Sequence, residues 1–205
     1  ENKIHVDSLR DDYNITFMHT PAYLKESVKL MTRMIPNMKK LIFLGDGIYP
    51  NPEYNKQLKN IITRNFPYLQ YQFISSYNYT LPELYNALRN ADKETGVLVS
   101  TWFAETLTSQ QMLINAYRSL SSISSPLFSI RYAGMDDGGM VGGYMYNEKI
   151  FINELLRNVS QMLNGKPARE IPFFVPADAH PTFNYTTLVN KGLNPKLCPQ
   201  DSIFY

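Results

Sequence analysis

Four short apolar runs recur along the chain at similar distances, and helical patterns of apolar residues separate them. The runs lie at Leu41–Leu44, Tyr71–Ile74, Val97–Ser100 and Leu127–Ile130. Short runs of this kind are typical of strands that are buried on both faces of a sheet. Strand and helix alternate in units of about 30 residues, as in βαβ motifs. The pattern therefore predicts an α/β fold, with a parallel sheet flanked by helices.

The helical patterns have recognisable starts. Proline fits the first turn of a helix, and Ser or Thr followed three residues later by Glu or Gln forms a capping box. The predicted starts are Thr20-Pro21, Pro52, Thr80 with Glu83, and Thr108 with Gln111. Pro36 is expected to end the first of these helices, because proline cannot continue the hydrogen-bond ladder.

Three more elements are predicted towards the C-terminus. A helix is expected from Glu148 to a stop at Gly165, a strand at Ile171–Val175 and a short helix at Tyr185–Lys191. Helical spacing on the first of these places one apolar face towards a core. The residues expected to be buried on that face are Phe151, Ile152, Leu155, Val159 and Met162.

A glycine-rich segment precedes that helix and resembles a phosphate loop at first sight. Its glycines are Gly138, Gly139, Gly142 and Gly143. A phosphate loop needs GxGxxG or GxxxxGK[ST] spacing directly before a helix N-terminus, and the spacing here is GGxxGG. Glycines inside a strand mark a bulge or a close approach of another backbone. We therefore interpret the segment as a structural one.

Composition and charge exclude several classes of protein. The chain has 205 residues, 44% hydrophobic and 19% charged, with a formal net charge of +2. These values are typical of an ordinary folded protein, and no basic cluster indicates nucleic-acid binding. The single cysteine, Cys198, excludes an intrachain disulfide. No stretch reaches the roughly 20 apolar residues of a membrane span, so contact with a membrane is expected only through flanking segments.

Aromatic and hydrogen-bonding residues follow the predicted strands. In open α/β sheets, ligands bind outside the carboxyl ends of the strands. These residue types suit a small polar or zwitterionic ligand, although each aromatic residue could equally serve packing. The candidate ligand-binding residues are Asp46, Tyr49, Ser75, Tyr77, Thr101, Trp102, Arg131 and Tyr132.

Enzymatic function has little support in the sequence. There is no GxSxG elbow, and the three histidines lack metal-ligand spacing. Asp136 and Asp137 are adjacent, so in extended chain their side chains point to opposite faces. A phospho-receiver domain needs an aspartate at the end of the third strand, where Ser100-Thr101-Trp102 stands. We expect no catalytic residue, no metal and no cofactor.

Several motifs together resemble the type I periplasmic-binding fold, in particular the ABC-transporter substrate-binding-like family. They are Ile35–Leu41, Gly139–Tyr144, Met162–Pro167, Glu170–Pro172 and a tail that runs from Phe183 through Leu197–Ile203. The resemblance covers most of the chain from about Thr20 onward. It implies a Rossmann-like lobe, one of two that surround a hinged cleft in such proteins.

The resemblance also implies how the chain is organised. Residues 1–135 are expected to form the second α/β lobe, and residues 136–205 the crossover strand, returning helix and tail. The glycines Gly138, Gly139, Gly142 and Gly143 would be the structural hinge or crossover between the lobes. The first lobe would then be largely missing. The helix from Glu148 would lose part of its packing surface and would either fold back on this lobe or pair with a second copy in a homodimer.

The implied function is the binding of a small molecule in an interlobe cleft. The Asn-, Lys- and Tyr-rich composition favours the extracytoplasmic, periplasmic sensor region of a bacterial inner-membrane histidine kinase of a two-component system. A substrate-binding protein of an ABC transporter is the alternative. A small α/β enzyme is a third, and it would need a base or a metal site.

Overall fold

The computed structural model describes residues 9–10, 12–102, 120, 122–132, 135, 139–176 and 178–204. The chain divides into two compact units, which we call unit 1 and unit 2. Unit 1 comprises Glu1–Pro21 and Tyr146–Ala179, and unit 2 comprises Ala22–Met145 and His180–Tyr205. The chain therefore passes between the units three times. The assignment of residues 1–135 and 136–205 to separate parts stays a prediction.

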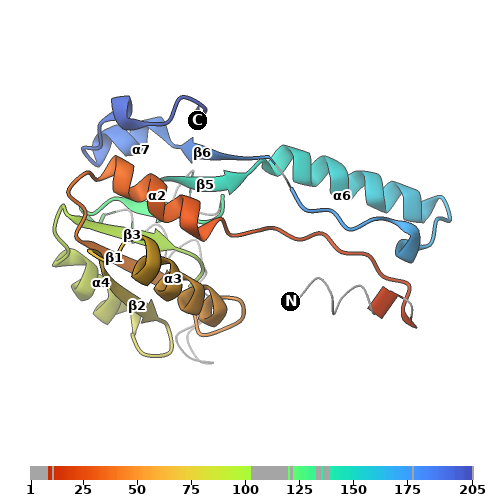
Figure 1. Cartoon of the computed structure of the whole chain (residues 1–205), viewed down its shortest axis with the longest axis horizontal. Coiled ribbons are helices and arrows are strands. Elements are labelled where there is room, and N and C mark those ends of the chain that lie inside the picture. The colour runs from red at the N-terminus through yellow and green to blue at the C-terminus, as the bar shows by residue number, and fades with distance from the viewer. Residues whose placement is uncertain are drawn as a thin grey trace. The chain divides into compact units, whose positions relative to one another are not determined.

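Unit 2 is built on a sheet in which seven strands of the described residues take the order β2-β1-β3-β4-β5-β6-β7 (Figure 1). The strands are β1 Lys40–Gly45, β2 Gln70–Ser75, β3 Thr95–Val99, β4 Leu127–Ser129, β5 Met140–Tyr146, β6 Ala179–Phe183 and β7 Ile203–Phe204. The pairs from β2 to β5 and the pair β6–β7 are parallel. Asn184 N–H donates to Val141 O and Asn147 N–H to Asp178 O, so β5 and β6 run in opposite directions. The predicted α/β fold with a parallel sheet is confirmed.

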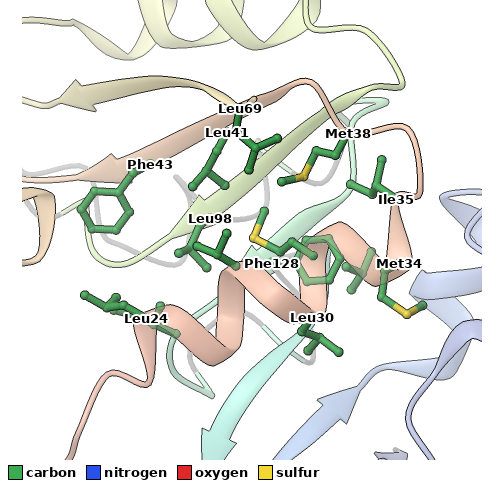
Figure 2. Close-up of a cluster of buried hydrophobic side chains, with 14 of the residues drawn as sticks. Leu24, Leu30, Met34, Ile35, Met38, Leu41, Phe43, Leu69, Leu98 and Phe128 are labelled. Carbon is green, nitrogen blue, oxygen red and sulfur yellow. The ribbon is translucent and has the colours of Figure 1, made fainter. Parts of the chain in front are cut away.

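Two hydrophobic clusters cover the two faces of this sheet. Alternate residues of β1 point to opposite faces, so Leu41 and Phe43 join one cluster and Ile42 and Leu44 the other. The first cluster contains residues from the helices α2 (Leu24–Met34), α3 (Asn51–Asn65) and α7 (Tyr185–Asn190), and Figure 2 shows many of its side chains around α2 and the strands. The second contains residues from α4 (Leu81–Arg89). Helices on both faces are the doubly wound arrangement that the alternation of strands and helices predicts.

The helices of unit 2 are α2 Leu24–Met34, α3 Asn51–Asn65, α4 Leu81–Arg89 and α7 Tyr185–Asn190. The capping box of Thr80 and Glu83 is present at α4, as predicted. The predicted cap at Thr20 is wrong: Tyr23 is the N-cap of α2 and makes no side-chain cap. The predicted short helix near the C-terminus is confirmed as α7. The helix predicted from Thr108 lies outside the described residues.

Unit 1 contains α6 Glu148–Leu163, the 3-10 helix η1 Ala168–Glu170 and extended chain. The predicted strand at Ile171–Val175 is reduced to one parallel bridge between Phe174 and Met18. Around it, Phe174 N–H donates to Phe17 O (3.1 Å) and His19 N–H donates to Phe174 O (2.9 Å). This stretch therefore pairs with the segment around Met18 over a single bridge.

The burial predicted for α6 is wrong. The helix begins and ends where expected, with the Asn147 side chain capping it. However, its apolar face is exposed, and Phe151 is only partly buried. The exposed residues of this face are Ile152, Leu155, Leu156, Val159, Met162 and Leu163. We call these six residues the α6 apolar face. Its expected fold-back or homodimer contact stays a prediction.

The buried side chain of α6 is instead polar. Asn158 is 2% exposed, and neither atom of its side-chain amide has a hydrogen-bond partner among the described residues. Burial of an unpaired amide costs free energy, so this position is unfavourable in the structure as it stands. Within the described residues, no helix is long and apolar enough to cross a membrane.

Candidate functional site

The carboxyl ends of three neighbouring strands bring several predicted site residues to one edge of the sheet. β1 lies between β2 and β3, so the strand order reverses beside β1. Leu44 is in register with Val99, and Val99 with Ser129. Two residues beyond these partners lie Asp46, Thr101 and Arg131. Such a switch point is where open α/β sheets bind ligands, and we call this edge the switch-point edge.

Asp46 is a buried hydrogen-bond acceptor at the switch-point edge. It is 2% exposed. Its Oδ1 accepts hydrogen bonds from Ile48 N–H (3.0 Å) and Asn51 Nδ2 (2.6 Å), and its Oδ2 accepts one from Thr101 Oγ1 (2.8 Å). Both carboxylate oxygens are therefore engaged within the protein. The side chain is placed to hold the loop after β1 to the end of β3 rather than to reach outward.

Asn51 completes this network, and the sequence did not single it out. The side-chain amide of Asn51 also donates to Thr101 Oγ1 (2.7 Å). Asn51 is 0% exposed, and its Oδ1 has no partner among the described residues. It is the first residue of α3, next to two prolines. An Asn at that position reads as a helix-start residue, so the sequence offered little signal of a link to β3.

Arg131 and Tyr54 form a second pair at the same edge. Tyr54 comes from α3, and both side chains are half-buried. Burial raises the pKa of the Tyr54 phenol, while the positive charge of Arg131 and a hydrogen bond from it oppose that rise. Tyr49 also lies close enough to influence the pKa of Tyr54. Arg131 N–H donates to Ser129 Oγ (3.2 Å), which ties the residue to the end of β4.

Exposed aromatic rings stand at the loops after β1 and β2. Tyr49 is 72% exposed and Tyr77 is 73% exposed. The Tyr77 ring lies on Gly47, where an added Cβ would be only 1.6 Å from it. Ser75 is buried, and its Oγ accepts a hydrogen bond from Tyr77 N–H (3.3 Å). The two loops thus present broad, accessible ring surface beside the Asp46 network.

The remaining predicted residues have other surroundings. Trp102 is buried in the second hydrophobic cluster, and Tyr132 is packed against the same cluster. In β5, a Cβ on Gly142 would be 2.3 Å from Thr182 O, and one on Gly143 would be 1.8 Å from Ser129 O. These two glycines therefore allow close approach of β5 to its neighbours. Gly139 has φ 69°, and Gly138 lies outside the described residues.

The described residues of the switch-point edge are suited to binding by their chemistry. Its carboxylate is enclosed, and its hydroxyls and rings are hydrogen-bonding and packing groups. Across the part of the chain that the structure describes, no three His, Cys, Asp or Glu side chains gather in a way that could hold a metal ion.

Comparison with solved structures identifies the fold. A conserved domain protein from Vibrio cholerae O1 biovar El Tor is 13% identical, with a TM-score of 0.67 over 92% of this chain and 62% of that one. The ABC domain from Streptococcus pneumonia, in complex with L-Trp, is 14% identical, with a TM-score of 0.64 over 92% and 63%. A substrate-binding protein with adhesive properties from Clostridium difficile, ligand-free and open, is 13% identical, with a TM-score of 0.57 over 87% and 58%.

These likenesses show that the chain shares its α/β fold with part of each of the three structures. At this level of identity they show the fold alone. The chain spans about three fifths of the length of the three structures. Neither models of protein families nor curated protein sequences match it.

Proposed function

We propose that unit 2 supplies one wall of a binding site for a small polar molecule. The observation that carries this proposal is the buried network of Asp46, Asn51 and Thr101 beside the exposed rings of Tyr49 and Tyr77. A mutually bonded polar network keeps the switch-point edge in one shape. Rings that are held in place then offer a ligand contact area at little cost in conformational entropy.

The solved structures support binding as the function. One of them is a complex with L-Trp, and another is named as a substrate-binding protein. Because the chain spans only part of their length, we propose that a second lobe in the full-length protein provides the opposite wall. A ligand that binds one arrangement of two lobes more tightly shifts the population towards it, and this shift is the signal.

We propose that the signal passes to a histidine kinase, with the binding region outside the inner membrane and no catalysis in the region itself. This role rests on the sequence resemblance and on the composition. Delivery of substrate to an ABC transporter is the second candidate, favoured by the names of two of the similar structures. A strain that lacks the gene separates the two. Loss of ligand uptake supports transport, and loss of a transcriptional response with uptake intact supports the sensor.

Thermal unfolding of the full-length protein tests binding directly. We expect at least one compound in a panel of amino acids, sugars, nucleosides and short peptides to stabilise it. Free ligand at one hundred times its dissociation constant adds about 2.7 kcal/mol to the free energy of unfolding. If no compound in the panel has an effect, the proposed function is wrong.

Two tyrosine variants locate the site. Tyr49→Ala and Tyr77→Ala are each expected to weaken binding about threefold to tenfold, because a ring contact is lost. Tyr68→Ala is the matched control, since Tyr68 is 64% exposed and lies just before β2, at the opposite edge of the sheet. Equal weakening by all three variants would place the site elsewhere.

A further inference from the structure

Arg131 is the one cationic residue in the segments that follow the first four strands, at 45–49, 75–78, 100–102 and 130–132. Its place follows from the register, because Val99 and Ser129 are partners and Thr101 and Arg131 lie two residues beyond them. The residue is half-buried, so part of it remains accessible at the switch-point edge. Its charge should therefore influence what binds there.

The carboxylate of Asp46 is already engaged and is not available as a partner for Arg131. Asp46 receives three hydrogen bonds, from Ile48, Asn51 and Thr101, and these occupy both of its oxygens. Among the described residues, no carboxylate forms an ion pair with Arg131. The side-chain partner that the structure gives it is the Tyr54 phenol, which is neutral. A guanidinium has five N–H donors, more than one phenol oxygen can accept, so Arg131 can pair with a second group beside Tyr54.

Tyr54 lies beside the guanidinium on a well-packed helix. The phenol belongs to α3, which is anchored in the first hydrophobic cluster through Leu58 and Ile62. A phenol is neutral near pH 7, and burial raises the pKa of Tyr54 further, so its oxygen can accept a hydrogen bond from Arg131 without competing as a charge. An oriented guanidinium loses less entropy when it pairs with a second group.

We propose that Arg131 pairs with a carboxylate of the ligand, with Tyr54 as the residue that positions it. This inference rests on the proposed function and names the class of ligand: an amino acid or another small carboxylic acid. A planar guanidinium matches a carboxylate with two parallel hydrogen bonds. A phosphate site in an α/β fold instead uses successive backbone N–H groups of a glycine loop at a helix N-terminus, and the spacing GGxxGG does not provide one. The neighbouring rings of Tyr49 and Tyr77 suit the apolar remainder of such an acid.

Matched pairs of acids and amides test the proposal on the full-length protein. The probes are the twenty proteinogenic L-amino acids with their C-terminal amides, benzoate with benzamide, and pyruvate with pyruvamide. Each amide keeps the shape of its acid and lacks the negative charge. Thermal shift and calorimetry are expected to show that at least one acid binds about tenfold to a hundredfold more tightly than its amide.

Variants assign the effect to Arg131. Arg131→Gln is expected to remove the preference for the acid, and Arg131→Lys to keep part of it. Tyr54→Phe, which keeps the ring and removes the hydroxyl, is expected to reduce the preference without abolishing binding of the amide. Arg64→Gln is the matched control, because Arg64 is an exposed residue in the last turn of α3. The acid and amide comparison needs no variant, so it holds even if Arg131→Gln does not fold.

The outcomes separate the two proposals. If a ligand is found but its acid and amide bind equally, or if Arg131→Gln leaves the preference unchanged, the carboxylate inference is wrong and the binding function stands. A ligand that lacks a carboxylate, including a phosphate ester, has the same consequence. If neither these probes nor the wider panel bind, both proposals are wrong.

Discussion

The two units of this chain contain amphipathic helices of similar design, yet they bury them to very different degrees. In unit 2, α2 places Val28 and Met31 in a fully buried cluster, and α4 does the same with Leu84 and Leu88. In unit 1, α6 leaves its apolar face exposed and buries Asn158 instead. The difference shows that helical periodicity specifies which face is apolar, whereas burial depends on a sheet that can cover it.

Core truncation should give the largest contrast between the units. Phe128 on β4 is fully buried in the first cluster, so Phe128→Ala is expected to lower the free energy of unfolding by about 3–5 kcal/mol. Leu156→Ala on the α6 apolar face is the matched control, with an expected change within about 0.5 kcal/mol. Urea unfolding measures both. A large loss for Leu156→Ala would mean that the face is covered in solution.

Substitution of Asn158 is the next test, and it is expected to raise the free energy of unfolding rather than to lower it. Asn158→Leu replaces a buried amide, which has no partner in the part of unit 1 that the structure describes, with an apolar group of similar size. We expect stabilisation of α6 by about 1–3 kcal/mol, measured by hydrogen exchange of its backbone amides. Asn153→Leu, at an exposed position of the same helix, controls for helix propensity and should change stability by only a few tenths of a kcal/mol. Destabilisation by Asn158→Leu would show that the amide has partners in solution.

Removal of a helix cap is expected to cost about the same free energy in the two units. Thr80 caps α4 in unit 2, and the Asn147 side chain accepts hydrogen bonds from Lys149 N–H and Ile150 N–H in unit 1. Thr80→Ala and Asn147→Ala are each expected to cost about 1 kcal/mol, because a cap acts within one helix turn. Hydrogen exchange in the first turns of α4 and α6 measures this. Very unequal costs would contradict a purely local role.

Acid should produce the smallest effect, and we expect it at the start of α4 in unit 2. Hydrogen bonds from the Thr80 backbone N–H and side chain lower the pKa of Glu83 below its ordinary value of 4.5. Because the pKa is lower in the folded state, the carboxylate contributes stability above the unfolded pKa, and this is lost as the pH falls through the folded pKa. The pH dependence of urea unfolding below pH 4.5 should therefore be slightly weaker in Glu83→Gln. An unchanged profile would contradict the linkage.

Local signals predicted the fold well, and long-range contacts limited the prediction. The apolar runs identified β1 to β4, and the pair Thr80 and Glu83 identified the start of α4. The start of α2 was misplaced because His19 is held extended by its bond to Phe174 O, so the chain turns into the helix only after Tyr23. Nothing in the residues around Thr20 reveals that distant partner.

At the candidate site, too, local signals were predictive and long-range contacts were not. The rule that ligands lie at the carboxyl ends of strands drew attention to Asp46, Thr101 and Arg131, which the register brings to one edge. The rule could not show that Asp46 is enclosed. It also missed Asn51 and Tyr54, because both residues come from α3 and reach the edge only through the packing of that helix against the sheet.

The position of Trp102 has an optical consequence. It is the single tryptophan of the chain, it directly follows Thr101, and it is buried in the second hydrophobic cluster. Its emission therefore reports on one place only, the end of β3. A ligand that orders this edge, or a solvent that loosens it, should change the fluorescence of one indole without any attached label. Tryptophan fluorescence therefore reports on unit 2 and not on unit 1, which contains no tryptophan.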